Sequence, residues 1–187
     1  MIIATRHASH ARLVMESLQH AKAVYVEKPL SLAMEELTGI RQTVIETGNN
    51  RLMVGFNRRF SPMLESLVER LRTKTGPWVM SYRVHAGQLE SGSWYADRNE
   101  GLRFAGEAGH FIDVLSHVAN SRPATVFASG LRPGRTHGDD LDNLIAVLEY
   151  ENGSIANLTY ATQGGTKLPK EYLEVVGNGM AMQLHNF

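Results

Sequence analysis

The alternation of short apolar runs with helical stripes in the first sixty residues is the feature that most constrains the fold. Apolar residues gather at 1–5, 24–26 and 51–56, which predicts three buried strands. The segments between them, 10–21 and 31–48, place apolar side chains at helical spacing. Strands that alternate with helices predict a parallel, doubly wound sheet with right-handed crossovers.

Capping residues predict where the helices of this part begin and end. Ser31 is the expected N-cap of the second helix, and Gly48 is expected near its end. Ser61 and Pro62 predict the start of a third helix, because proline is favoured at the first helical position.

The pattern changes after Gly76 and Pro77, where strand-like runs replace the alternation. We expect a strand at 78–85, a long loop at 86–106 and a helix at 108–120. Asn152-Gly153 is a hairpin signal, and residues 177–179 form a second turn. Residues 137–140 are also expected to form a turn. Further strands are predicted at 124–131, 143–150, 154–162, 171–177 and 180–186.

The predicted fold class is therefore α/β followed by α+β. A partial Rossmann domain with a parallel sheet would occupy residues 1–60, and a mostly antiparallel open-sheet domain residues 61–187. The opening of the chain directly on a strand predicts that it begins within a domain.

Composition narrows the function classes. The 187 residues include no cysteine, which excludes disulfides, thiolate metal ligands and a cysteine nucleophile. The formal net charge is zero and basic residues form no long run, so we expect no nucleic-acid partner. No apolar run approaches the roughly 20 residues of a membrane span, and the start lacks the features of a signal peptide. We expect a cytoplasmic protein with no membrane partner.

The triplet Glu27-Lys28-Pro29 follows the second predicted strand and is the first candidate site. Open α/β sheets bind ligands at the carboxyl ends of their strands, so a lysine there directs a charge towards a ligand crevice. The alternative is a solvated charge pair in a strand-to-helix loop.

A polar stripe on the predicted helix 108–120 is the second candidate site. His110, Asp113 and His117 recur at i, i+3 and i+7 on an otherwise apolar helix. His110, expected at the helix start, would be kept neutral by the helix dipole and so suit a general base, with Glu107 to orient it. The alternative is that Asp113 and His117 pair with each other and have only a structural role.

A metal site on His110, Asp113 and His117 is a further alternative. Ligands two turns apart are separated by about 10 Å along the helix axis, which is far for one ion. We therefore expect no metal. Asn57, Arg58 and Arg59, after the third strand, could line the same crevice as Lys28 or could be solvated. No G-x-G-x-x-G motif is present, so the usual grip on a dinucleotide pyrophosphate is missing.

Together these residues resemble the glucose-fructose oxidoreductase / inositol dehydrogenase / MocA (Gfo/Idh/MocA) family of oxidoreductases, shortened at the N-terminus. The most specific mark is the E-K-P triplet at residues 27–29. Residues 2–5 with His10 are similar to a strand and helix of the family's nucleotide domain. Residues 55–60 are similar to the segment that closes that domain, and residues 106–113 to the helix start that carries the catalytic histidine.

The resemblance implies an enzyme that transfers hydride between NAD or NADP and a sugar, inositol or related polyol. It implies that Lys28 hydrogen-bonds the reacting hydroxyl, that His110 exchanges its proton, and that Asp113 and Glu107 assist. It also implies a homo-oligomer, a dimer or tetramer, through the open sheet, and a candidate cis bond between Lys28 and Pro29. Thr5, His10, Glu27, Lys28 and Pro29 would border the cofactor, and Asn57 and Arg59 the substrate.

The chain departs from the family pattern at two places. Many members carry an aspartate four residues before the histidine, where this chain has Gly106. The glycine loop of the first strands is also missing. An alternative function is therefore a non-catalytic remnant that binds sugar or mediates oligomerisation, and a third is the metal-dependent enzyme considered above.

Overall fold

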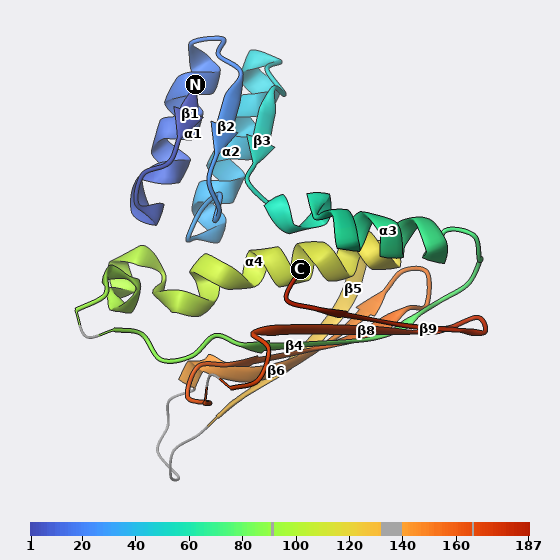
Figure 1. Ribbon diagram of the computed structural model, residues 1–187. Helices are drawn as coiled ribbons and strands as arrows, with labels where there is room; N and C mark the ends of the chain where they lie inside the picture. The colour runs from blue at the N-terminus through green and yellow to red at the C-terminus, as the bar shows by residue number, and fades with distance from the viewer. Residues whose placement is uncertain (91, 132–139, 166) are drawn as a thin grey trace. The chain divides into compact units, whose positions relative to one another are not determined.

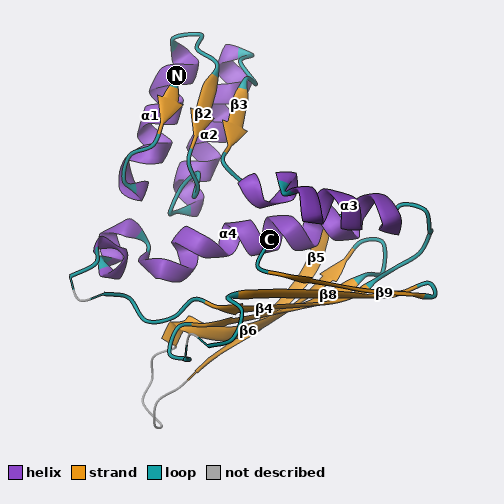
Figure 2. Cartoon of the chain, viewed as in Figure 1, coloured by secondary structure: helices purple, strands orange, loops and turns teal. Residues whose placement is uncertain are grey.

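The computed structural model describes residues 1–90, 92–131, 140–165 and 167–187, with the side chains of 102, 140 and 141 left aside. By their contacts, these residues form two units (Figures 1 and 2). The first comprises Met1–Phe56 and Ser91–Gly109, and the second Asn57–Glu90 and His110–Phe187. The first unit's N-terminal part ends at Phe56, near the predicted domain boundary at residue 60. That boundary stays a prediction. The contacts also place the later segment Ser91–Gly109 in the first unit.

The first unit contains the predicted parallel sheet, in the order β1-β2-β3. Its strands are β1 (Ile2–Ile3), β2 (Val24–Val26) and β3 (Leu52–Val54), with Ile3 beside Val26 and Val26 beside Val54. Helices α1 (His10–Gln19) and α2 (Met34–Thr47) connect them. The partial Rossmann arrangement is thereby confirmed.

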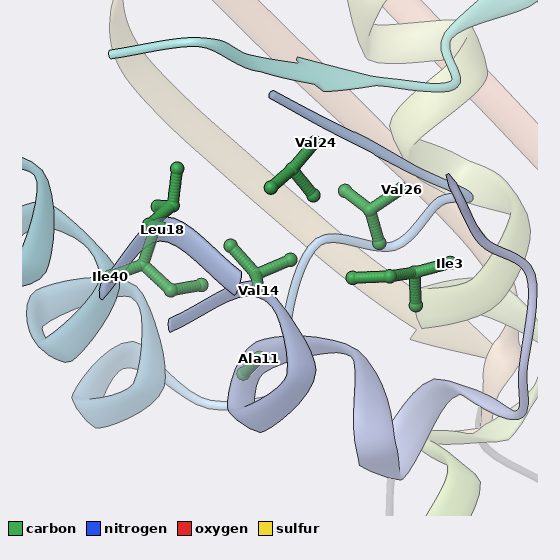
Figure 3. Packing of buried hydrophobic residues seen from close by; sticks show 7 residues of the cluster. All are labelled: Ile3, Ala11, Val14, Leu18, Val24, Val26 and Ile40. Atoms are coloured by element: carbon green, nitrogen blue, oxygen red, sulfur yellow. The ribbon is translucent and has the colours of Figure 1, made fainter. Parts of the chain in front are cut away.

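One face of this sheet packs against α1 and α2, as Figure 3 shows. Ala11, Val14 and Leu18 recur at i, i+3 and i+7, so they line one side of α1, and each is at most 1% exposed. Burying a valine or leucine side chain such as Val14 or Leu18 contributes on the order of 1.5–3 kcal/mol. The remaining members of the cluster are Ile3, Val24, Val26 and Ile40.

The expected cap of α2 is wrong, whereas its expected end is confirmed. Ala33 occupies the N-cap position, and the Ser31 hydroxyl donates to the Ala33 carbonyl instead of accepting from a helical amide. The backbone amide of Leu32, just before the helix, donates a hydrogen bond to the carboxylate of Glu36 in the first turn of α2. Gly48 ends the helix with φ of 65°, in the left-handed region that glycine adopts easily.

The second unit is built on a six-stranded sheet in the order β5-β6-β7-β4-β8-β9. Every neighbouring pair is antiparallel except β4 and β7, so the predicted mostly antiparallel sheet is confirmed. The turns at 152–153 and 177–179 join β6 to β7 and β8 to β9, as predicted. The strands are β4 (Val79–His85), β5 (Pro123–Leu131), β6 (Asp140–Tyr150), β7 (Ile155–Ala161), β8 (Glu171–Gly177) and β9 (Met180–His185). Residues 137–139 of the predicted turn lie outside the described residues.

Helix α3 (Pro62–Leu71) and the second half of α4 (Leu102–Ala119) cover one face of this sheet (Figure 2). Tyr82, Leu158 and Leu173 alternate with outward-facing neighbours along their strands and are fully buried. Helix α3 starts at Pro62, as predicted. Within the described ranges, no helix is long and apolar enough to cross a membrane.

The predicted loop at 86–106 and the predicted start of the following helix are wrong. Two short 3-10 turns, η3 (Trp94–Ala96) and η4 (Arg98–Glu100), interrupt the segment, and α4 begins at Leu102. The glycines at 106 and 109 concealed the first turns of α4, because glycine is a weak helix former. His110 therefore lies inside the helix, so the helix dipole is no reason for it to be neutral.

Candidate functional site

Lys28 lies at the carboxyl ends of the parallel strands, as the sequence predicted. β2 ends at Val26, two residues before it, and the chain leaves the sheet there towards α2. The Lys28–Pro29 peptide bond is cis, in agreement with the expectation. This is the edge at which open α/β sheets bind their ligands.

The Lys28 ammonium is held by two groups of the Ser91–Gly109 segment. Its Nζ donates to the carbonyl oxygen of Gly106 at 3.0 Å and to the hydroxyl of Tyr95 at 3.4 Å. It also lies 5.9 Å from the centre of the Tyr95 ring, within cation–π range. Lys28 and Tyr95 are both half-buried, so the ammonium is oriented but still reaches the surface.

A buried histidine that the sequence analysis missed, His7, packs against the aromatic residues that precede α4. Its ring lies 4.9 Å from that of Trp94 and 5.6 Å from that of Tyr95, both edge to face. Its Nδ1 is 2.9 Å from the carbonyl oxygen of Glu100. Burial lowers the pKa of His7, and the positive charge of Lys28 lowers it further. Both effects favour the neutral form of the His7 imidazole. Its position three residues before the start of α1 carries no signal that could have revealed it.

The space around Gly106 leaves no room for the aspartate that the family resemblance led us to look for at this position. A Cβ atom at this position would lie 2.7 Å from Cε1 of His7 and 2.9 Å from Cε1 of Tyr95. Both distances are shorter than packed side chains allow, so the two rings occupy the space that an aspartate side chain needs. Lys28 meets a backbone carbonyl and a phenol there.

His10 was expected to border the cofactor, but the structure places its ring in the interior with no exposed surface. Nδ1 lies 2.7 Å from the carbonyl oxygen of Pro29, and Nε2 lies 3.0 Å from that of Thr5. At least one contact is a hydrogen bond in every protonation state, and both are when the ring carries two protons. His10 thus ties the end of β1 to the loop after Lys28.

Three other predicted residues of this unit have partners of their own. The Thr5 hydroxyl is 2.6 Å from that of Ser9. Glu27 accepts a hydrogen bond from the Tyr25 hydroxyl at 3.1 Å. Glu107, expected to orient His110, accepts from Nε of Arg103 at 3.2 Å, one turn earlier in α4.

In the second unit, the structure brings together two residues that the sequence analysis named separately. Arg59 forms a bidentate ion pair with Asp113, in which Nε lies 2.9 Å from Oδ2 and Nη2 contacts Oδ1. The hydrogen bond to Asp113 raises the pKa of Arg59. His110, one turn before Asp113 in α4, is 6% exposed. Asn57, expected at the substrate, is exposed in η2 (Asn57–Phe60).

The expected pairing of Asp113 with His117 is wrong, because Arg59 takes both carboxylate oxygens. Burial lowers the pKa of His117, and the charges of Arg59 and Arg72 lower it further. Among the residues that the structure describes, no group of three or more His, Cys, Asp or Glu side chains is placed to hold a metal ion. The geometry therefore gives the metal alternative no support.

A buried network near the start of the second unit was also missed. The guanidinium of Arg58 meets Glu171 with Nε 2.9 Å from Oε2 and Nη2 2.5 Å from Oε1. The Tyr82 hydroxyl donates to the same carboxylate at 2.7 Å, and Arg58 lies over the ring of Phe111 at 5.1 Å. Burial alone would raise the pKa of Glu171, but the hydrogen bonds from Arg58 and Tyr82 outweigh it and lower that pKa.

Comparisons with known proteins agree with this architecture. Residues 1–56 match a family described as the oxidoreductase family with an NAD-binding Rossmann fold, and residues 77–182 match the GFO/IDH/MocA C-terminal domain. The chain is 27% identical over 169 residues to the uncharacterized oxidoreductase YrbE of Bacillus subtilis, which covers 87% of this chain and 48% of that protein. It is 27% identical over 171 residues to inositol 2-dehydrogenase of Rhizobium meliloti, with 88% and 51% covered.

A solved structure shows the same fold. The NAD-binding protein from Listeria innocua superimposes with a TM-score of 0.79 at 26% identity, and the match covers 98% of this chain and 52% of that one. The chain thus spans about half the length of the relatives that it matches.

Proposed function

The chain belongs to the Gfo/Idh/MocA family of oxidoreductases. We therefore propose that it catalyses hydride transfer between a nicotinamide cofactor and a polyol or sugar. The observation that carries this proposal is the position of Lys28. Its ammonium lies at the carboxyl ends of the parallel strands, where two acceptors orient it. A cation there stabilises the negative charge that develops on a hydroxyl oxygen during oxidation.

The strand ends suit the nicotinamide half of NAD or NADP, and Thr5, Glu27, Lys28 and Pro29 would border it. The pyrophosphate has no glycine-rich loop in these 187 residues. When bound, the nicotinamide supplies the hydride chemistry. Lys28 would donate a hydrogen bond to the reacting oxygen, and His110 would hold the proton that leaves it during oxidation and return it during reduction.

The proposed substrate class is an inositol-like polyol, supported by relatives named inositol 2-dehydrogenase and scyllo-inositol 2-dehydrogenase (NAD(+)). Neutral hydroxyls suit a site in which Lys28 meets a carbonyl and a phenol. The Arg59–Asp113 pair presents both signs of charge near His110 in α4, so it would position a polyol without favouring an acid. A cytoplasmic location stays a prediction.

We further propose a homo-oligomer, a dimer or tetramer, formed through the uncovered face of the six-stranded sheet. Apolar side chains that point out of this face are unusually exposed, with Phe127 at 72%, Ile145 at 53% and Ile155 at 45%. Sedimentation velocity tests this proposal, and a monomer at micromolar concentration would contradict it.

The alternative is a non-catalytic module that keeps the fold without turnover. Titration with NADH and NADPH, followed by cofactor fluorescence, separates the two functions. We expect saturable binding in the micromolar range and NAD⁺ or NADP⁺ reduction with a polyol. We also expect Lys28→Ala and His110→Ala each to lower turnover roughly 10²-fold or more. Lack of cofactor binding up to millimolar concentration would favour the non-catalytic module.

A further inference from the structure

Among the described residues, the two hydrogen bonds of the Lys28 ammonium both go to acceptors in the segment Ser91–Gly109. Tyr95 comes from η3 and the Gly106 carbonyl from α4, whereas Lys28 itself follows β2, more than sixty residues earlier in the chain. The lysine is therefore oriented by a part of the chain that is remote in sequence but belongs to the same unit.

The number of N–H bonds limits what this ammonium can do. A lysine ammonium has three donors and no acceptor. The Gly106 carbonyl and the Tyr95 hydroxyl take two of them, and among the described residues no other acceptor contacts Nζ. Two fixed donors leave the third pointing in one direction.

The ring of Tyr95 is itself held in place. It packs against Trp94 at 4.2 Å between ring centres and against the buried ring of His7 at 5.6 Å. His7 is in turn fixed by its contact with the carbonyl of Glu100, and the Glu100 carboxylate accepts from the amide of Ala8 at 3.1 Å. The phenol is therefore a preorganised partner and not a mobile surface side chain.

We propose that Tyr95 is a positioning residue of the oxidoreductase site, which acts through Lys28. Its hydroxyl and the Gly106 carbonyl hold two N–H bonds of the ammonium, so that the third donates to the reacting hydroxyl of the polyol. This inference rests on the proposed function, because it assigns Tyr95 a part in the same reaction. It makes η3 a determinant of turnover, although η3 lies in a segment without any chemical motif.

Tyr95→Phe tests the assignment, because it removes one hydroxyl and keeps the ring. In the full chain we expect kcat for polyol oxidation to fall roughly 10-fold, as for the loss of one hydrogen bond to a charged group, with the KM for the cofactor unchanged. Tyr172→Phe is the matched control, since it removes a phenol hydroxyl that pairs with Glu174 on β8. Equal kcat in wild type and Tyr95→Phe would overturn the proposal.

A second readout does not need turnover. Proton–nitrogen correlation spectra follow the hydrogen exchange of the Lys28 ammonium, with the signal assigned by its loss in Lys28→Arg. We expect the Lys28 ammonium to exchange its hydrogens at least three-fold faster in Tyr95→Phe than in wild type, because one hydrogen bond is lost. In Tyr172→Phe we expect no change in this rate. An unchanged rate would overturn the assignment of Tyr95. If the wild type turned over no polyol, the proposed function would fail, and this exchange rate would still decide whether Tyr95 holds Lys28.

Discussion

The ammonium of Lys28 lies 3.0 Å from the carbonyl oxygen of Gly106, a backbone group of a helix that begins 74 residues further along the chain. A helical carbonyl near a glycine is open to such a contact, because no side chain shields it. The absence of a side chain at residue 106 is therefore part of the lysine site.

Gly106→Ala provides a test of this relationship, since alanine is the better helix former by about 1 kcal/mol. The new Cβ would meet the rings of His7 and Tyr95 at 2.7 and 2.9 Å, so the rings must shift. We expect lower turnover, comparable to Tyr95→Phe, and a lower melting temperature despite the better propensity. Gly39→Ala in α2 is the matched control, because its Cβ meets only the flexible end of Met15 at 3.1 Å. Equal melting temperatures for the two variants would contradict this account.

Glu171→Gln is expected to destabilise the second unit. It leaves the guanidinium of Arg58, whose side chain is only 20% exposed, without an opposite charge. Removing one partner of a buried pair costs about 3 kcal/mol of unfolding free energy. Urea denaturation measures this loss. Glu174→Gln, on the same strand, serves as control, because Glu174 is only half-buried and pairs with the neutral groups of Tyr172 and Gln183. A similar small effect in both variants would refute the prediction.

The same carboxylate predicts a pH dependence in acid. Because the pKa of Glu171 is lower in the folded protein than its ordinary value of 4.5, the unfolded chain binds the proton more readily. The stabilisation is present above about pH 4.5 and is lost as the pH falls through the lowered pKa. Urea midpoints of the wild type should therefore fall more steeply between pH 5 and about pH 3 than those of Glu171→Gln. Parallel curves would remove Glu171 as the cause.

His117 predicts a second pH dependence, in a higher window. Its folded pKa lies below the ordinary 6.5 because of burial and the charges of Arg59 and Arg72, which outweigh Asp113 and Glu65. Between the two pKa values the unfolded chain holds more protons, so stability declines as the pH falls below 6.5. His117→Gln should flatten the decline in melting temperature between pH 7 and about pH 5. His20→Gln, which removes an exposed imidazole of the other unit, is the control.

The ion pair between Arg59 and Asp113 should show measurable coupling. The Asp113 side chain is 11% exposed and the contact is bidentate, so we expect a coupling of about 1–3 kcal/mol in a double-mutant cycle with Arg59→Leu and Asp113→Asn. The exposed pair Arg12–Glu16, with side chains 63% and 51% exposed, gives the comparison at about 0.3–0.5 kcal/mol. Unfolding free energies from urea curves supply both values, and equal couplings would contradict the expected effect of burial.

Local patterns were enough to predict the strands, the parallel start, the hairpin turns and the position of Lys28. These features depend on periodicity and on turn residues, which act over a few neighbouring positions. The start of α4 could not be predicted in this way. Tertiary packing stabilises its glycine-containing first turns, and the pattern of residues 102–109 contains no sign of it.

The sequence by itself determined the order of the elements, the apolar faces that bury Ile3, Val14 and Leu18, and the strand end that carries Lys28. Only the tertiary structure decided the partners of the charged side chains. Tyr95 and Gly106 at Lys28, Asp113 at Arg59 and Glu171 at Arg58 are each separated by more than fifty positions from the residue that they bind. A charge far along the chain leaves no periodic signal at the residue that it pairs with, because the pairing arises only when distant segments of one unit fold together.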